Sequence, residues 1–101
     1  SDLAVRQLAQ RRRYAGAVFL RQALFDTDSD VAQAAAVAIV SIPGTQVERD
    51  LLSLYEQLSL RQRIGILQEL KAQSREMPRF VAYAAADTHR EVRRLAQEIA
   101  R

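Results

Sequence analysis

The sequence contains no cysteine, no tryptophan, three glycines, two prolines and only six aromatic residues. Without cysteine there is no disulfide scaffold, and so little glycine and proline leaves few turns for a β-sandwich or barrel. No apolar run reaches the roughly 18 residues of a membrane-spanning helix, and the chain does not open on a signal-peptide pattern. We therefore expect neither a disulfide scaffold nor a β-sandwich or barrel, and no membrane insertion by this segment.

The residues that are abundant favour helix. The chain has 17 Ala and 12 Leu, which lead the helix-propensity scale, and its 101 residues suffice for one domain with a real core. We predict an all-α domain spanning residues 1–101. The lack of cysteine fits a reducing cytoplasm, so we expect a cytoplasmic protein or the cytoplasmic domain of a larger, membrane-anchored one.

The basic residues are 14 arginines and a single lysine, Lys71, and the formal net charge is +3. A charge this small permits an acidic partner without requiring one. The arginine excess has two interpretations, a bias in coding sequence or a binding surface for an acidic partner, and composition does not choose between them.

Helix start and stop signals predict seven helices joined by short turns. The acidic turn at residues 26–30 is expected to cap the third helix, because carboxylates accept hydrogen bonds from the first amides of a helix. Thr45 and Glu48 have the spacing of a capping box, and Pro78 suits a first helical turn. The predicted helices cover residues 2–13, 14–25, 31–42, 47–58, 59–72, 78–87 and 90–101.

The sequence repeats itself. Residues 5–10 (VRQLAQ) recur as residues 92–97 (VRRLAQ), with five of six positions identical and a separation of 87 residues. Residues 31–35 and 64–67 occupy the same frame, and the anchors Val5, Val31, Ile64 and Val92 are 26, 33 and 28 residues apart. Each interval holds one additional helix, so the repeating unit is a helical hairpin of roughly 30 residues.

Two stretches, residues 23–39 and 87–96, resemble the HEAT-like repeat of the bilin-lyase type, an armadillo-like family. Residues 23–39 have its aspartate-rich turn followed by Val and closely spaced alanines, but Val31-Ala32 replaces the Val-Arg of the pattern. Residues 87–96 retain that pair as Val92-Arg93, after a turn that begins at Asp87. Residues 58–70 lack both the Asp turn and the Val-Arg. The resemblance implies a right-handed α-solenoid of about three hairpins and about seven helices, in which small residues let neighbouring helices approach closely.

The residues provide no constellation for catalysis. A single histidine, His89, without cysteine cannot build the paired iron site of HEAT-type hydroxylases or a usual zinc site, and its position predicts a solvated or capping side chain. The acidic turn places Val31 and Val37 where a calcium loop needs Gly and Glu. We predict a non-enzymatic protein with no catalytic, metal or cofactor-binding residues. A substrate-docking role in a lyase-type enzyme stays open as an alternative.

Nucleic acid binding is a second alternative, because HEAT-like DNA glycosylases hold phosphates on a concave basic face. Here Glu and Asp residues are interspersed among the arginines, and no tryptophan is available to stack on bases. Arg93 sits at the repeat's own arginine position, where pairing with an acid of the turn is the simpler expectation. The arginines that could form such a stripe are Arg11, Arg12, Arg13, Arg61, Arg63, Arg90, Arg93, Arg94 and Arg101.

We therefore predict a protein-interaction scaffold whose partner is another protein with an acidic surface. The expected interface lies on the outward side of the second helices, where solvation alone is an equally good explanation. We also expect the chain to be a segment of a longer protein, because it opens on a second-helix copy and ends without a stop signal. The candidate interface residues are Arg61, Arg63, Gln68, Arg93, Arg94 and Gln97.

Overall fold

The computed structural model describes Leu3 and residues 21–101 of the chain. Over these residues it is helical and contains no strand, so the prediction of an all-α fold is confirmed there. The predicted helix at 2–13, most of that at 14–25, and Arg11–Arg13 lie outside the described residues. The elements are α2 (Ser29–Ile39), α3 (Gln46–Leu54), a 3₁₀ turn η1 (Tyr55–Gln57), α4 (Leu60–Gln73), α5 (Pro78–Ala84) and α6 (Arg90–Ala100).

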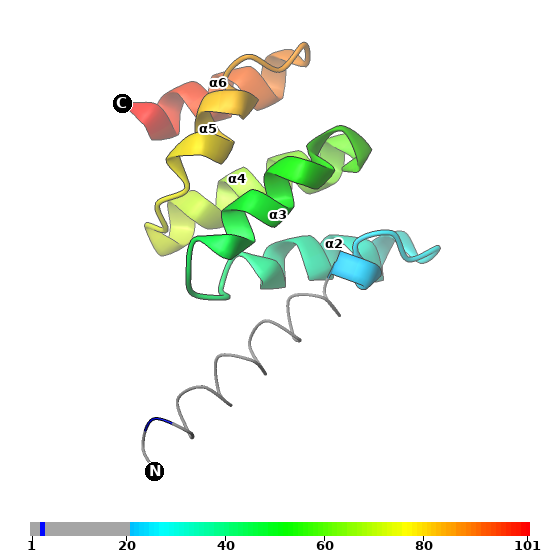
Figure 1. Ribbon diagram of the computed structural model, residues 1–101. Coiled ribbons are helices and arrows are strands. Elements are labelled where there is room, and N and C mark those ends of the chain that lie inside the picture. The colour runs from blue at the N-terminus through cyan, green and yellow to red at the C-terminus, as the bar shows by residue number, and fades with distance from the viewer. Residues whose placement is uncertain (1–2, 4–20) are drawn as a thin grey trace.

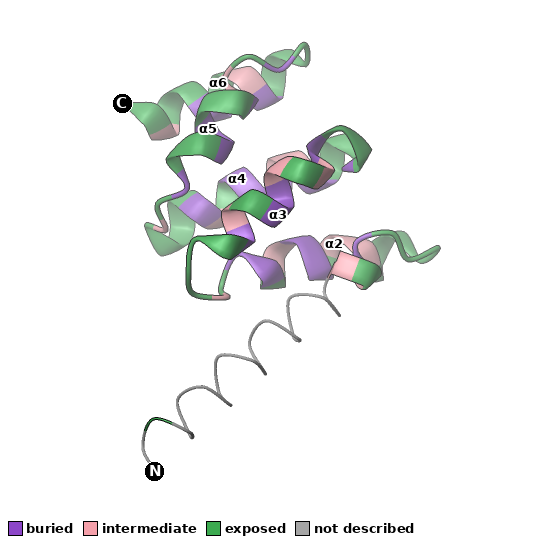
Figure 2. Cartoon of the chain, in the orientation of Figure 1, coloured by how far each residue is buried: buried purple, intermediate pink, exposed green. Residues whose placement is uncertain are grey.

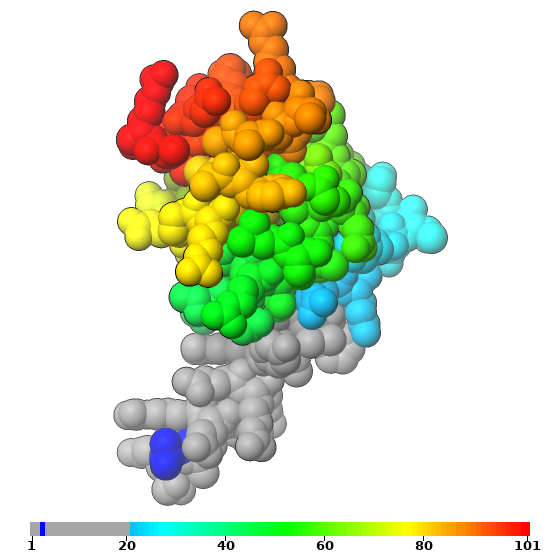
Figure 3. All heavy atoms as spheres, turned by 45° about the horizontal axis from the view of Figure 1, so that its top comes forward, coloured from blue at the N-terminus to red at the C-terminus, as the bar shows by residue number. Residues whose placement is uncertain are grey.

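The helices alternate between two layers (Figure 1). Helix α4 packs against α2 on one side and α6 on the other, whereas α5 packs against α6 and α3. In the space-filling view α5 lies directly beside α3 (Figure 3). From α2 to α6, the chain thus crosses from one layer to the other between successive helices.

The buried residues of both layers form one apolar cluster (Figure 2). Of the predicted stripe, Val47, Leu51, Tyr55 and Leu58 are buried, and Leu54 is half-buried. The single predicted helix at 47–58 is wrong in one respect, because α3 ends at Leu54 and continues as η1. The tighter 3₁₀ turn accompanies the burial of the Tyr55 ring, which packs edge-on against Phe80 at 5.5 Å.

The acidic turn caps α2, as predicted. Asp28 is the N-cap residue, and its Oδ1 accepts from the amides of Asp30 and Val31 at 2.9 and 3.4 Å. Asp26 in turn accepts from the Asp28 amide at 2.8 Å. Helix α2 starts at Ser29, before the predicted residue 31, because the capping residue is the second aspartate of the turn and not the last.

The predicted capping box of Thr45 and Glu48 is wrong. Thr45 has a helical backbone (φ −84°, ψ −17°) and makes no side-chain cap bond, since capping needs an extended residue. The Glu48 carboxylate instead accepts from the amides of Arg79 and Phe80 at 2.9 and 3.3 Å, and so caps α5 from another helix. A capping box does form where the backbone is extended, between Ser59 and Gln62.

The turn motif recurs with a 61-residue offset. The N-cap residues Asp28 and His89 are equivalent, and α2 and α6 both contain 11 residues. Asp87 accepts from the His89 amide at 2.7 Å, as Asp26 does from Asp28. The repeated valines differ, however: Val92 is fully buried, whereas Val31 is 43 % exposed. Buried Ala35, Ala36 and Ile39 supply the core contacts of α2 instead.

Replacing His89 by aspartate is expected to stabilise the protein by about 1 kcal/mol. His89 occupies the N-cap position of α6 but makes no side-chain cap bond, whereas Asp28 does so at the equivalent position. Thermal unfolding followed by circular dichroism measures the change. The reciprocal variant Asp28→His is the matched control and is expected to be destabilised by a similar amount; a lower melting temperature for His89→Asp would contradict the equivalence.

Candidate functional site

The six predicted interface residues fall into two groups. Arg61, Gln68, Arg94 and Gln97 are exposed on the adjacent helices α4 and α6. Arg63 and Arg93 lie on the same two helices but are partly buried. Their guanidinium groups bind parts of the protein itself, so the two groups have different roles.

Arg63 joins three segments of the chain. Its Nη1 lies 3.2 Å from Oδ2 of Asp87, and its Nε and Nη2 donate to the Tyr55 carbonyl at 3.3 and 3.1 Å. The guanidinium also lies over the Tyr55 ring, 4.5 Å from its centroid. The Arg63 and Asp87 side chains are only 17 % and 3 % exposed. This arginine therefore links α4 to η1 and to the α5–α6 turn.

The Asp87 carboxyl group, which Arg63 and Tyr55 both bind, is held ionised. Burial raises the pKa of Asp87, but the Tyr55 hydroxyl, the His89 amide and Arg63 together outweigh burial and leave that pKa below its ordinary value. The pKa of Tyr55 is raised by burial and because its hydroxyl donates to Asp87 at 2.5 Å. The exposed Tyr83 hydroxyl donates to Glu56, which raises the pKa of Tyr83.

The free energy of unfolding is expected to fall at both ends of the pH scale. Asp87 has a depressed pKa in the folded state, so its contribution is present above the unfolded value of 3.8 and is lost as pH falls through the lower folded pKa. Tyr55 has a raised pKa, so its contribution is present below the unfolded value of 10.0 and is lost as pH rises above it.

Urea unfolding at a series of pH values tests both slopes. The variant Asp87→Asn is expected to flatten the acid slope, and Tyr55→Phe the alkaline slope. Tyr83→Phe is the matched control, since the Tyr83 hydroxyl is bound to the Glu56 carboxylate at an exposed position. An unchanged alkaline slope in Tyr55→Phe would contradict the assignment.

Arg93 closes the turn before α6. Its Nη1 donates to the carbonyls of Asp87 and Thr88 at 3.0 and 2.9 Å. The expected pairing with an acid of the turn is therefore replaced by bonds to the backbone of that turn. The Asp87 carboxylate is occupied by Arg63 and Tyr55 instead.

Arg75, which the sequence did not single out, has a comparable role at the opposite ends of the helices. Its Nη1 donates to the carbonyls of Val40 and Ile42 at 3.0 and 2.7 Å, and its Nη2 to Gly44 at 2.9 Å. Gly44 has φ 102°, a conformation in which glycine is unstrained. The five donors of one planar guanidinium can serve several carbonyls at once, which an ammonium cannot do as well.

A groove runs along the seam between α2 and α4. It encloses about 390 Å³, and Arg61 at its side pairs with Asp30 at 3.4 Å. Gln33 crosses the seam and donates to the Arg61 carbonyl at 3.1 Å. A second hollow of about 300 Å³, also lined by Gln33 and Arg61, continues toward the acidic turn. The groove is lined by Gln33, Leu60, Arg61, Ile64, Gly65 and Gln68.

The absence of a side chain at Gly65 shapes this groove. A Cβ atom there would overlap the amide nitrogen of Gln33 and contact Val37. Glycine is unfavourable inside a helix by about 1 kcal/mol relative to alanine, so its presence in α4 is explained by this close approach. Two of the predicted interface residues, Arg61 and Gln68, lie on the groove wall.

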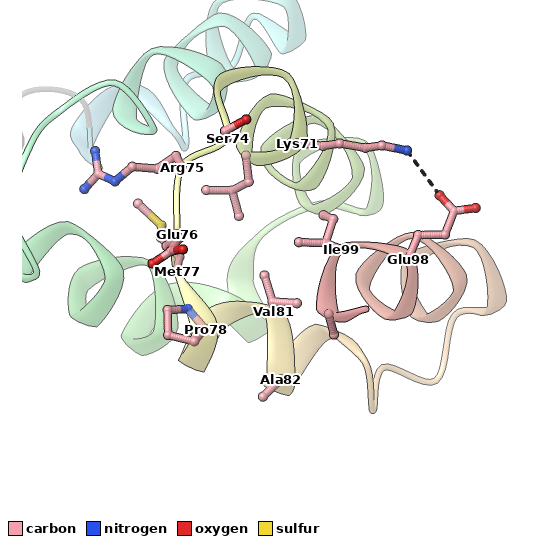
Figure 4. Close-up of a pocket in the computed structure, with 12 residues that line it drawn as sticks. Lys71, Ser74, Arg75, Glu76, Met77, Pro78, Val81, Ala82, Glu98 and Ile99 are labelled. Carbon is pink, nitrogen blue, oxygen red and sulfur yellow. Dashed lines mark ion pairs between the residues drawn. The ribbon is translucent and has the colours of Figure 1, made fainter.

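A larger hollow of about 680 Å³ lies where α4 and α6 end and α5 begins (Figure 4). Its apolar side includes Met77, Val81 and Ile99, and Lys71 and Glu98 form an ion pair at 3.6 Å across its rim. None of the six predicted interface residues lines it. Its two cations are already engaged, Lys71 by Glu98 and Arg75 by backbone carbonyls.

The exposed face of α6 is more nearly neutral than its arginines indicate. Arg94 binds Glu91 at 2.9 Å and Glu98 at 3.1 Å along the same helix. Residues 21–101 as a whole carry eleven basic and eleven acidic side chains, so the entire net charge of +3 comes from residues 1–20. The described part of the chain is therefore electrically balanced.

Neither a metal-binding cluster nor a membrane-spanning helix is found within the described residues. No three His, Cys, Asp or Glu side chains come together there in a way that could hold a metal ion. No helix in that part of the chain has the length and apolarity needed to cross a bilayer.

Comparison with known proteins gives no match. No protein-family model matches the chain, and neither the curated proteins nor the solved structures contain a significant match to it.

Proposed function

We propose that the chain is a protein-interaction module built of HEAT-like helical hairpins that stack as a right-handed α-solenoid. The alternation of helices between two layers and the recurrence of the aspartate turn 61 residues apart support this architecture. Modules of this kind bind partners through the continuous surface that successive helices present.

The observation that carries the proposal is the exposure of Arg61, Gln68, Arg94 and Gln97 on α4 and α6, two helices that pack against each other. Arg61 and Gln68 also line the α2–α4 groove. Arg63 and Arg93 are removed from the proposed interface, because their guanidinium groups bind the fold internally. The interface residues are thus Arg61, Gln68, Arg94 and Gln97.

A protein partner with an acidic surface is favoured over nucleic acid. Binding to phosphates requires a clear excess of positive charge on the binding face, and three of the described arginines of the predicted stripe, Arg61, Arg63 and Arg94, are each paired with a carboxylate. Single exposed arginines still suit carboxylates, because the planar guanidinium forms paired hydrogen bonds with them. No feature of the described residues favours the lyase-type alternative.

Site-specific photo-crosslinking in the native host tests the proposal. A benzophenone amino acid placed at Gln68 or at Gln97 is expected to capture the same protein partner. Gln46 is the matched control, because it is an exposed glutamine on α3 in the other layer. Adducts of equal yield from Gln46, or none from Gln68 and Gln97, would contradict the proposed interface. Salt-sensitive binding to duplex DNA with no protein adduct would favour the nucleic acid alternative.

A further inference from the structure

The side chains around the α2–α4 groove have a distinctive chemistry. Arg61 is the only charged residue among those that line it, and no acidic side chain is present. Gln33 and Gln68 contribute two amides, and Leu60 and Ile64 contribute two aliphatic surfaces, of which Leu60 is 40 % exposed. A positive charge, amides and aliphatic patches together match a ligand with a carboxylate, peptide groups and an aliphatic side chain.

The charge of Arg61 is available to a partner. Its present partner is Asp30 at 3.4 Å, and the two side chains are 60 % and 87 % exposed. Exposed ion pairs of this kind contribute only about 0–1 kcal/mol. A carboxylate of a bound partner can therefore take the place of Asp30 at little energetic cost.

The side-chain oxygen of Gln33 has an unused capacity to accept a hydrogen bond. Its amide nitrogen donates to the Arg61 carbonyl, but its Oε1 is buried without a hydrogen-bond partner among the described residues. A buried acceptor left unsatisfied costs about 1–3 kcal/mol. Rotation of the Gln33 amide into the groove would offer this oxygen to the N–H of a bound peptide. The Gln33 amide fills the space beside Gly65, so the same rotation would free that space for a peptide backbone.

We infer that the α2–α4 groove binds an extended peptide segment in which a glutamate or aspartate adjoins an aliphatic residue. The inference rests on the proposed function and names the partner's recognition element. Arg61 binds the carboxylate, Leu60 and Ile64 contact the aliphatic side chain, and Gln33 and Gln68 bind the peptide groups. A basic segment does not fit, because the groove lining offers it no anionic side chain.

Nuclear magnetic resonance titration of the full chain with short capped peptides tests the inference. The probe is Ala-Leu-Glu-Leu-Ala, and the comparison peptides replace Glu by Gln or by Lys. We expect the Glu peptide to shift the Gly65 backbone amide and the side-chain amides of Gln33 and Gln68, with a Kd of about 1 mM. The Gln and Lys peptides are expected to bind about threefold more weakly, which is about 0.6 kcal/mol and within the range of an exposed ion pair.

Two variants and a control sharpen the test. Arg61→Gln is expected to remove the preference for Glu over Gln, and Gly65→Ala to weaken all the peptides because the added methyl group displaces the Gln33 amide. Arg79→Gln, on α5 in the other layer, is the control and is expected to bind like the wild type. Shifts absent from Gly65, or equal shifts with the Lys peptide, would overturn the inference.

The outcomes separate this inference from the proposed function. If Gln68 crosslinks a protein while the Glu peptide leaves Gly65 unshifted, the interface stands and the peptide specificity fails. If the peptide binds at the groove while no protein is captured from Gln68 or Gln97, the peptide specificity stands and the proposed interaction module fails.

Discussion

Replacing Arg63 by alanine is expected to lower the free energy of unfolding by about 3 kcal/mol, the largest effect of any charged residue in the described part of the chain. The substitution leaves the Asp87 carboxylate, 3 % exposed, without its cation. It also removes two hydrogen bonds to the Tyr55 carbonyl and the guanidinium from the Tyr55 ring. Chemical unfolding in urea measures the loss.

The matched control is Arg61→Ala on the same helix. Arg61 pairs with Asp30 at 3.4 Å, but both side chains are exposed, so the expected loss is about 0.5 kcal/mol. The double variant Arg63→Met with Asp87→Asn is expected to be more stable than Arg63→Met alone, because it removes the unpaired buried charge. Equal losses for Arg63→Ala and Arg61→Ala would contradict the structural role of Arg63.

The sequence predicts much of the fold because helix signals are local. Helix boundaries are indicated by the aspartate turn and by Pro78, and a buried face is indicated by the stripe from Val47 to Leu58. The structure confirms these features. The Thr45–Glu48 pair shows the limit of local patterns. Its spacing is that of a capping box, but the start of α5, brought near by tertiary packing, binds the Glu48 carboxylate instead.

The candidate site is harder to predict from sequence, because the side chain of an arginine at a polar helix position can either extend into solvent or bind other parts of the fold. Arg61 and Arg63 are two residues apart on α4, yet the first side chain is 60 % exposed and the second 17 %. What distinguishes them is the position of Tyr55 and Asp87, which depends on the packing of α3 and α5. Sequence periodicity does not contain that information.

The excess of arginine over lysine acquires a structural explanation in the described residues. Arg63, Arg75 and Arg93 each donate to two or three backbone oxygens at turns. Turns between short helices leave carbonyls without intrahelical partners, and a planar guanidinium on a long side chain can reach several of them. Arginine therefore serves this fold as an internal connector as well as an exposed charge.

Replacing Arg75 by alanine is expected to have the second large effect, lowering the free energy of unfolding by about 2 kcal/mol. Arg75 holds the carbonyls of Val40, Ile42 and Gly44, so it fastens the segment between α2 and α3 to the end of α4. Those carbonyls would be left with water as their only new partner, at a point where the two layers meet. The loss is measured by urea unfolding, and hydrogen exchange is expected to accelerate first at residues 40–45.

The variant Arg75→Lys distinguishes the contribution of positive charge to stability from that of the guanidinium geometry. If positive charge alone were sufficient, Arg75→Lys would retain nearly all of the stability. We expect it to recover less than half, because one ammonium cannot reproduce the divergent bonds of Nη1 and Nη2 to three carbonyls. Arg79→Ala is the control, with an expected loss below about 0.5 kcal/mol, since the Arg79 side chain is exposed and its contact with Glu48 runs through the backbone amide. A wild-type melting temperature in Arg75→Lys would show that positive charge, and not the divergent guanidinium donors, stabilises the segment between α2 and α3.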